Sequence, residues 1–443
     1  MALLKILCYN GIMKKFWCLL LIAIFLLGCA AEPDAPVAVL SPAPAATTPP
    51  TPQAPTPEPT DAPAPTDAPT PEPIATPEPT DAPTPEPTLS PDERLYAYID
   101  GLSVEEKIGQ LCMFGFSGTE KISAEFRSIL REYRIGSVIL YGQNMSRSNK
   151  DGGFAQCAGL INSVKNASDS EIPLLFSIDV EGGNVTRFRW SKSIVSARVL
   201  GTKNDTEKAR GQFCYIAEGL KSVGINVDLA PCLDIAKKPD ATFLKKRIIS
   251  SDAQIAASIG VACIEGLHDG GCLSVVKHFP GHGATSADSH ANTPVVNKSL
   301  ESLTGYELIP FSAASGVADG VMVAHILYPS IDPDRIASQS SVFITDLLRN
   351  VLGFEGFIMS DDFRMAGLRN QTSLKKAAVQ FILAGGDLIL CGANHSYQRQ
   401  ILTGLYEAVE NGTISEERLN ESVYRILSAK MRVTGWSPFE NQD

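Results

Sequence analysis

Basic side chains are missing from a long stretch near the start of this chain. Residues 30–92 contain no lysine or arginine, although they hold 21 of the 30 prolines and ten acidic residues. The 351 residues that follow carry 35 basic and 39 acidic side chains, so most of the formal net charge of −11 comes from the proline-rich stretch. The near-neutral part has no basic excess for holding phosphates, and we expect no nucleic-acid partner.

The amino-terminal apolar run, 16–27, is too short to span a bilayer. It follows Lys14 and Lys15 and leads into Leu-Leu-Gly-Cys, which ends at Cys29. This pattern is typical of an export signal and resembles a bacterial lipoprotein signal. We expect residues 1–29 to be a lipoprotein signal peptide, with Cys29 lipidated and the protein anchored to the outer face of the cell membrane. A simple signal peptide is the alternative.

Residues 30–92 lack the apolar side chains that a core needs. The octet 56–63 recurs unchanged at 76–83, and proline at every second or third position favours extended polyproline II. We expect a disordered, acidic Pro/Thr-rich linker that lifts a following domain off a membrane. A ligand for a proline-binding module is the alternative, but the repeat has no flanking Arg or Lys.

No C-x-x-C pair occurs in the chain, and the number of cysteines after the signal is odd. Several of them lie within apolar runs. We therefore expect small buried hydrophobic residues rather than a disulfide framework or a zinc site. The seven are Cys112, Cys157, Cys214, Cys232, Cys263, Cys272 and Cys391.

Short apolar runs alternate with amphipathic stretches throughout 93–443. Ser103 and Glu106 form a capping box, and Ser251-Asp252 begins a helix that ends at Gly270-Gly271. The strand-like runs are 111–116, 137–141, 174–178, 225–229, 273–276, 320–324, 357–359 and 388–390. Eight strands, each followed by a helix, predict an α/β fold: a (β/α)₈ TIM barrel over 93–443, with its active site at the carboxyl ends of the strands. An open, doubly wound parallel sheet is the alternative, because periodicity does not show closure.

Polar residues follow five of the eight predicted strands. Any one of them could simply cap a helix. Together, on one rim of a barrel, they predict a pocket for a polyhydroxylated ligand. They are Asp179, Asp228, Asp234, Lys277, His278, His325, Asp361 and Asp362.

Three of the six histidines lie within 278–290, so a metal site must be considered. Pro280 and Gly281 break any helix that would put His278 and His282 on one face, and Lys277 would repel a cation. We expect no metal and no other cofactor. The pair Asp288-x-His290 favours instead an imidazole that a carboxylate orients for general acid–base catalysis.

The run 277–290 resembles the signature of the β-N-acetylglucosaminidases of glycoside hydrolase family 3. Further matching segments occur in the family's order at 179–187, 230–235, 321–325 and 357–365. The resemblance covers most of 110–411. It implies hydrolysis with retention of configuration on a (β/α)₈ barrel.

The resemblance also implies residue roles. Asp361 would be the nucleophile that forms a covalent glycosyl-aspartate, and His290, held by Asp288, would be the acid and base. Asp362 would be a helix cap or a supporting partner, although an exchange of roles with Asp361 stays open. The implied substrate-binding residues are Asp179, Arg187, Lys277, His278 and Arg247. Arg247 is the weakest match, because Ile248 and Ile249 follow it where the family commonly has Ser and Phe.

The resemblance and the export signal together imply release of non-reducing terminal β-linked N-acetylglucosamine from cell-wall muropeptides or chitooligosaccharides. Two alternatives lie in the same family: a β-glucosidase, and a phosphorylase, because a neutral imidazole does not repel phosphate as a carboxylate would. A non-catalytic sugar-binding lipoprotein and a metal-dependent barrel hydrolase are alternatives from other classes. We expect a monomer.

Overall fold

Eight short parallel strands run through the centre of the domain. The computed structural model describes residues 89–146, 151–283 and 292–439. All of these belong to the second of two units into which the chain divides, 84–443. The predicted signal peptide with Cys29, nearly all of the predicted linker, and Asp288 and His290 lie outside the described residues.

Every residue of the eight strands is buried, as expected for a parallel sheet covered on both faces. The strand order is β10-β1-β2-β3-β4-β5-β6-β9. The strands are β1 (Cys112–Gly115), β2 (Ser137–Ile139), β3 (Leu175–Ile178), β4 (Val227–Asp228), β5 (Leu273–Phe279), β6 (Gly320–Val323), β9 (Phe357–Ser360) and β10 (Ile389–Cys391).

The sheet closes on itself between its two end strands. Met359 of β9 forms a parallel bridge with Leu388, just before β10. The Leu388 N–H donates to the Ile358 carbonyl at 3.0 Å, and the Ser360 N–H donates to the Leu388 carbonyl at 3.0 Å. The (β/α)₈ barrel is therefore confirmed, and the open doubly wound sheet is excluded.

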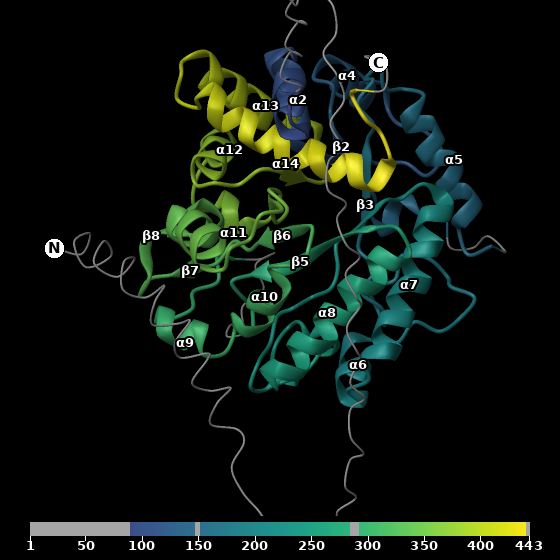
Figure 1. Ribbon diagram of the computed structural model, residues 1–443, viewed down its shortest axis with the longest axis vertical. Helices are drawn as coiled ribbons and strands as arrows, with labels where there is room; N and C mark the ends of the chain where they lie inside the picture. The colour runs from purple at the N-terminus through teal and green to yellow at the C-terminus, as the bar shows by residue number, and fades with distance from the viewer. Residues whose placement is uncertain (1–88, 147–150, 284–291, 440–443) are drawn as a thin grey trace, which may run out of the picture. The chain divides into compact units, whose positions relative to one another are not determined.

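Helices surround the strands, with α7 and α8 side by side and α12 beside α13 (Figure 1). The helices are α2 (Pro91–Asp100), α3 (Val104–Gln110), α4 (Ala124–Glu132), α5 (Phe154–Lys165), α6 (Ala197–Lys203), α7 (Thr206–Val223), α8 (Ala253–Asp269), α9 (Leu300–Thr304), α10 (Ile309–Ala314), α11 (Ala366–Arg369), α12 (Leu374–Leu383), α13 (His395–Glu410) and α14 (Glu416–Thr434). The predicted caps are present. Ser103 and Glu106 form a capping box at α3, and α8 has Asp252 as its N-cap and Gly270 as its C-cap. In the described ranges, none of the helices is long and apolar enough to cross a bilayer.

The segment between β6 and β9 departs from the simple alternation of strand and helix. It contains an antiparallel hairpin of β7 (Leu327–Tyr328) and β8 (Asp332–Ile336), followed by the π-helix η5 (Val342–Val351). The sequence did not predict the hairpin, because β8 is short, polar and largely exposed and so lacks the alternation of a half-buried strand. The sequence also ended the fifth strand too early, since β5 continues through Lys277 and His278.

Helix α14 covers the amino ends of the strands, opposite the predicted active-site end. Its residues contact positions just before three strands: Lys430 Nζ donates to the Gly136 carbonyl at 2.7 Å, Ser422 to Asp387 at 2.7 Å and Arg432 to Asp319 at 3.1 Å. Helix α14 is therefore fixed against the amino ends of these strands, opposite the carboxyl ends.

The seven cysteines of the domain are all free thiols, and all except Cys214 are buried. Burial raises the pKa of Cys157 to about 12, which keeps that thiol protonated. The prediction that these residues are small buried hydrophobic side chains therefore holds for six of the seven.

Lys430 is fully buried and has no carboxylate partner among the described residues. Its amine donates to Gln110 Oε1 at 2.6 Å and to the Gly136 carbonyl at 2.7 Å. Two acceptors match the two N–H bonds of a neutral amine, whereas an ammonium would bury a third donor and a charge. Burial lowers the pKa of Lys430 well below the ordinary 10.5.

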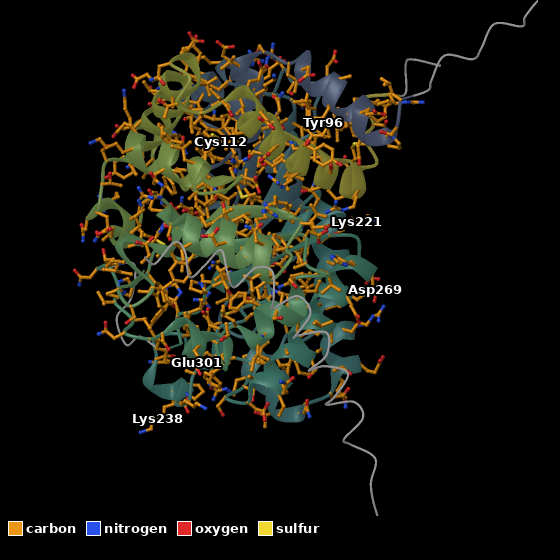
Figure 2. The ribbon with its side chains drawn as sticks, turned by 60° about the vertical axis from the view of Figure 1, so that its left-hand side comes forward. Tyr96, Cys112, Lys221, Lys238, Asp269 and Glu301 are labelled. Atoms are coloured by element: carbon orange, nitrogen blue, oxygen red, sulfur yellow. The ribbon has the colours of Figure 1, made fainter. Side chains whose placement is uncertain are left out.

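Because of this lowered pKa, we expect the free energy of unfolding to depend on pH. The unfolded chain gains a proton on Lys430 near pH 10.5 and the folded chain only at a much lower pH, so stability falls as the pH drops between the two values. In Lys430→Met that slope should disappear, although two buried acceptors lose their donor at every pH. Urea unfolding at a series of pH values measures it. The exposed Lys221 (Figure 2) supplies the control, Lys221→Met, and parallel curves for wild type and Lys430→Met would contradict the prediction.

Candidate active site

A cavity of about 510 Å³ opens at the carboxyl ends of the strands. Seven residues predicted from the sequence line it together: Asp179, Arg187, Arg247, Lys277, His278, Asp361 and Asp362. The cavity also receives Tyr141, Glu181, His282 and Arg364. The fold thus brings together side chains from segments more than 200 residues apart, although Asp288 and His290 are not among the described residues.

Two consecutive residues of β5 reach the cavity. Neighbouring residues of a regular strand point to opposite faces, yet Lys277 and His278 both line the pocket. The pairing of β5 with β6 shifts register between Lys277 and Phe279. This local irregularity turns both side chains toward the same rim.

Lys277 forms the floor of the cavity and is almost fully buried. Its Nζ lies 2.7 Å from Asp179 Oδ1 and 2.7 Å from Glu181 Oε1. Arg187 reaches the other oxygen of Asp179 at 2.9 Å. Burial raises the pKa of Asp179, but the charges of Lys277 and Arg187 outweigh it and hold the pKa well below 3.8. Both carboxylates on Lys277 therefore stay ionised.

Glu181 was not predicted as a site residue, although its motif was recognised. It lies two residues beyond Asp179, and that spacing puts two side chains on the same side of an extended segment. Arg247 clamps it with two bonds of 2.8 Å, from Nε and from a terminal nitrogen. Burial opposes ionisation, but Arg247 and Lys277 lower the pKa of Glu181 to about 2. The terminal nitrogen of Arg247 that contacts Glu181 also lies 3.3 Å from His278 Nε2, so this arginine lines the pocket as the sequence predicted.

Arg187 sits on a loop held by stacked aromatic rings. Its φ of 53° is in the left-handed region, which costs a non-glycine residue roughly 1–2 kcal/mol. Phe188 next to it stacks on Phe154 at 4.5 Å, and Trp190 packs edge-on against Phe154 at 5.2 Å. Trp190 Nε1 also donates to the Thr186 carbonyl at 3.2 Å. This packing offsets the backbone cost and aims Arg187 at Asp179.

His278 is oriented by Asp234, which is completely buried. The His278 Nδ1 and Asp234 Oδ2 atoms are 2.5 Å apart. The carboxylate favours a proton on Nδ1 and leaves Nε2 facing Arg247. The ring of His282 lies 5.0 Å from that of His278 despite the intervening Pro280 and Gly281, so no helix was needed to bring the two histidines together. Burial and the neighbouring His278 lower the pKa of His282 to about 4, so it is neutral near pH 7.

Cys232, Asp234 and His278 form a group whose potential metal-ligand atoms lie within 4.8 Å of one another. In the structure these atoms are joined by hydrogen bonds instead, with Cys232 Sγ donating to Asp234 Oδ2 at 3.2 Å. The guanidinium of Arg247 lies beside them. The charge of Arg247 beside this group disfavours a cation there.

Three strand-end residues that the sequence placed at the pocket do not line it. Asp228 and Asp234 are fully buried beneath the rim, where Asp228 accepts the Val180 N–H at 2.9 Å. Burial raises the pKa of Asp228 well above 3.8. His325 lies behind the seventh strand end, with Nδ1 2.7 Å from the Ser338 hydroxyl. These residues support the rim from below, since strand-end spacing cannot distinguish a side chain in the pocket from one beneath it.

Asp361 differs from the other carboxylates of the cavity. Asp179, Glu181 and Asp362 all form ion pairs with lysine or arginine, whereas Asp361 has none within 4.0 Å in the described part of the chain. Within the described ranges it accepts only the backbone N–H of Asp362, at 2.8 Å. Burial raises its pKa, but the nearby imidazoles, His278 foremost, outweigh burial and lower it. Asp361 is therefore an ionised carboxylate free to meet a ligand.

Tyr141 and Arg364 complete the rim and were not predicted. Tyr141 follows β2, where the sequence showed no charged residue, and Arg364 lay inside a recognised segment without an assigned role. Both contact Asp362: the Tyr141 hydroxyl donates at 2.8 Å, and Arg364 donates from Nε and a terminal nitrogen at 2.9 and 2.7 Å. A tyrosine just after a buried strand was the only available signal for the first.

The ion-paired pocket lies at the carboxyl ends of the strands of a closed (β/α)₈ barrel. Enzymes with this fold carry their active sites at that end. Residues 103–429 match the family model "Glycosyl hydrolase family 3 N terminal domain". The chain belongs to glycosyl hydrolase family 3.

Named relatives agree with this assignment. A beta-hexosaminidase A from Pseudoalteromonas piscicida is 29% identical over 70% of this chain, and a beta-hexosaminidase from Idiomarina loihiensis is 31% identical over 67% of it. The structure of a family 3 beta-N-acetylglucosaminidase from a Paenibacillus species superimposes with a TM-score of 0.71 and 35% identity over 77% of this chain. The matches cover 55%, 88% and 66% of those three proteins, respectively.

Because of the buried charges around Lys277, we expect its replacement to destabilise the fold more than replacement of Lys107, which is equally buried. Lys277→Met should destabilise the fold by about 3–5 kcal/mol at pH 7, because it leaves two buried carboxylates short of a partner. The loss should shrink as the pH falls from the ordinary carboxyl values of 3.8 and 4.5 toward the lowered ones, where both carboxyls become neutral. Urea unfolding at neutral and acidic pH measures it.

Lys107→Met is the matched control. Lys107 is equally buried, but its partner Glu416 is 72% exposed and can be solvated when the lysine is removed. Losses of equal size in the two variants would contradict the argument from buried charge.

Proposed function

We propose that this protein is a β-N-acetylhexosaminidase that releases non-reducing terminal β-linked N-acetylglucosamine with retention of configuration. One observation carries the proposal: among the described residues, Asp361 at the end of β9 has no lysine or arginine partner, whereas the other carboxylates that line the cavity are each paired with a cation. The names of relatives at 29–35% identity support the choice of sugar.

The reaction begins with attack of Asp361 on the anomeric carbon. A C–O bond to the carboxylate forms as the C–O bond to the leaving group breaks, which gives a covalent glycosyl-aspartate. Water then displaces the aspartate and regenerates it. Two displacements at one carbon retain the configuration.

The ion pairs around Asp361 bind the sugar hydroxyls. A hydroxyl can donate to a carboxylate oxygen and accept from a neighbouring cation, so Asp179 with Lys277 and Arg187 offers paired acceptor and donor sites. Arg247 presents further N–H donors at the same rim, with His278 Nε2 beside it. Because these groups already hold one another, little side-chain freedom is lost when the sugar binds.

We assign the acid and base role to His290, oriented by Asp288. The assignment rests on the family resemblance of 277–290, and it accounts for the absence of a second unpaired carboxylate among the described lining residues. The imidazole first takes up a proton, and the resulting imidazolium protonates the leaving oxygen. The neutral imidazole then deprotonates water.

Hydrolysis is favoured over phosphorolysis by the state of the cations. In the described part of the cavity, Arg187, Arg247, Lys277 and Arg364 are each committed to a carboxylate. A phosphate ion would therefore meet cations whose charge is already balanced by a carboxylate. This supports water as the acceptor.

For the location, we propose a lipid anchor at Cys29 followed by the linker 30–92, with the barrel facing cell-wall muropeptides or chitooligosaccharides. The Leu-Leu-Gly-Cys run at the end of the export signal supports it. In cells, Cys29→Ala should move the protein from the membrane fraction to the soluble or secreted fraction, because the lipid on this cysteine is the proposed attachment. Retention of Cys29→Ala in the membrane fraction would contradict the anchor.

The nucleophile can be tested by chemical rescue. Asp361→Ala should lower kcat on an aryl β-N-acetylglucosaminide by several orders of magnitude, because the first displacement loses its attacking group. Azide should restore release of the phenol: it attacks the anomeric carbon directly as the aryl oxygen leaves, and the product is the α-glycosyl azide. Stopped assays with product analysis measure both.

Substrate class is tested in the same assay. The wild type should prefer the aryl N-acetylglucosaminide to the aryl glucoside, turn over at the same rate with and without phosphate, and be indifferent to a chelator. Preference for the glucoside, a phosphorylated sugar product, or full activity of Asp361→Ala would each overturn the proposal.

A further inference from the structure

We propose that Asp362 is a positioning residue that clasps three strand ends together and thereby holds the adjacent Asp361 in place for attack. The inference rests on the proposed role of Asp361 as the nucleophile. It assigns a purpose to Tyr141, Arg364 and Gly392, which the reaction itself does not use.

The carboxylate of Asp362 is filled with donors. Oδ2 accepts from the Tyr141 hydroxyl at 2.8 Å and from Arg364 at 2.7 and 2.9 Å. Oδ1 accepts the backbone N–H of Arg364 at 3.0 Å and that of Gly392 at 3.2 Å. Neither oxygen is left to bind a sugar or attack one, which separates Asp362 from its neighbour.

The donors come from different strands. Tyr141 follows β2, Asp362 follows β9 and Gly392 follows β10. Burial, followed by the charge of Asp362, raises the pKa of Tyr141 well above 10.0, so the hydroxyl keeps its proton and donates. A single carboxylate therefore ties β2, β9 and β10 at the rim.

Two glycines make room for the clasp. A Cβ on Gly392 would lie 2.1 Å from Cζ of Arg364, and one on Gly115, at the end of β1, would lie 3.1 Å from the Tyr141 ring. Without these side chains the Arg364 guanidinium packs against the Gly392 backbone and lies 5.1 Å from the centre of the Tyr141 ring. The arginine is thus confined on several sides.

The clasp lies where the barrel closes. β9 and β10 are joined by one bridge, at Met359 and Leu388, and by a few backbone bonds, among them Phe363 N–H to the Leu390 carbonyl at 2.9 Å. Asp361 sits on the cavity side of this seam, one residue from the clasp, and its carboxylate accepts the N–H of Asp362. A loosened clasp would therefore shift the attacking oxygen, and a misplacement of about 1 Å can cost on the order of 100-fold in rate.

The experiment compares two variants that loosen the clasp by different means. Asp362→Asn removes the charge and keeps the shape. Gly392→Ala replaces none of the residues that line the cavity, and its added methyl group displaces the Arg364 guanidinium from Asp362. Both should lower kcat on an aryl β-N-acetylglucosaminide by roughly 10- to 100-fold while KM stays within about threefold, because sugar binding depends on other residues.

Gly316→Ala is the matched control, since an added Cβ there meets nothing within 4 Å. Thermal unfolding of each variant shows that it is folded at the assay temperature. Asp362→Ala with azide provides the second readout: a residue that only positions Asp361 leaves the nucleophile present, so azide should restore nothing.

The outcomes separate this inference from the proposed function. If azide restores Asp361→Ala while folded Asp362→Asn and Gly392→Ala turn over like Gly316→Ala, the clasp is unnecessary and the function stands. Azide rescue of Asp362→Ala would make Asp362 the nucleophile and overturn both. Loss of kcat in both variants without azide rescue of Asp362→Ala supports the positioning role.

Discussion

The compensation of charge in a buried space governs the carboxyl end of this barrel. Lys277 lies out of water and is tolerated there because Asp179 and Glu181 contact it at 2.7 Å. Those carboxylates in turn engage Arg187 and Arg247, and Arg247 reaches His278. The floor of the pocket is therefore a single connected unit. Its geometry is set by mutual attraction before any ligand arrives.

Asp361 is the exception to this pairing of charges. The pocket pairs the other described carboxylates that line it with cations, whereas Asp361 has only nearby imidazoles and one backbone N–H among the described residues. Asp361 and Asp362 are adjacent and identical in type, and the sequence could not tell their roles apart. Their surroundings do: one carboxylate is saturated by donors from three strand ends, and the other faces the cavity.

Much of the architecture could be predicted from the sequence. Runs such as 174–178 and 388–390 are short, apolar and regularly spaced, so they indicate buried parallel strands. Closure could not be predicted, because it rests on backbone bonds between Ser360 and Leu388 that carry no side-chain signal. The polar residues after each strand indicated the rim, but Glu181, Tyr141 and Arg364 act through contacts across the barrel that spacing along one chain does not reveal. Asp228 and His325 also lie at strand ends, yet they lie beneath the pocket and do not line it.

The pairing of β1 with β10 links residues near 112 with residues near 389. The loop-closure entropy of the long chain between them opposes this pairing. Without β10, β1 and β9 would both present open edges, and Asp361 would stand beside one of them. An incomplete barrel would therefore be an edge-exposed chain rather than a weaker enzyme.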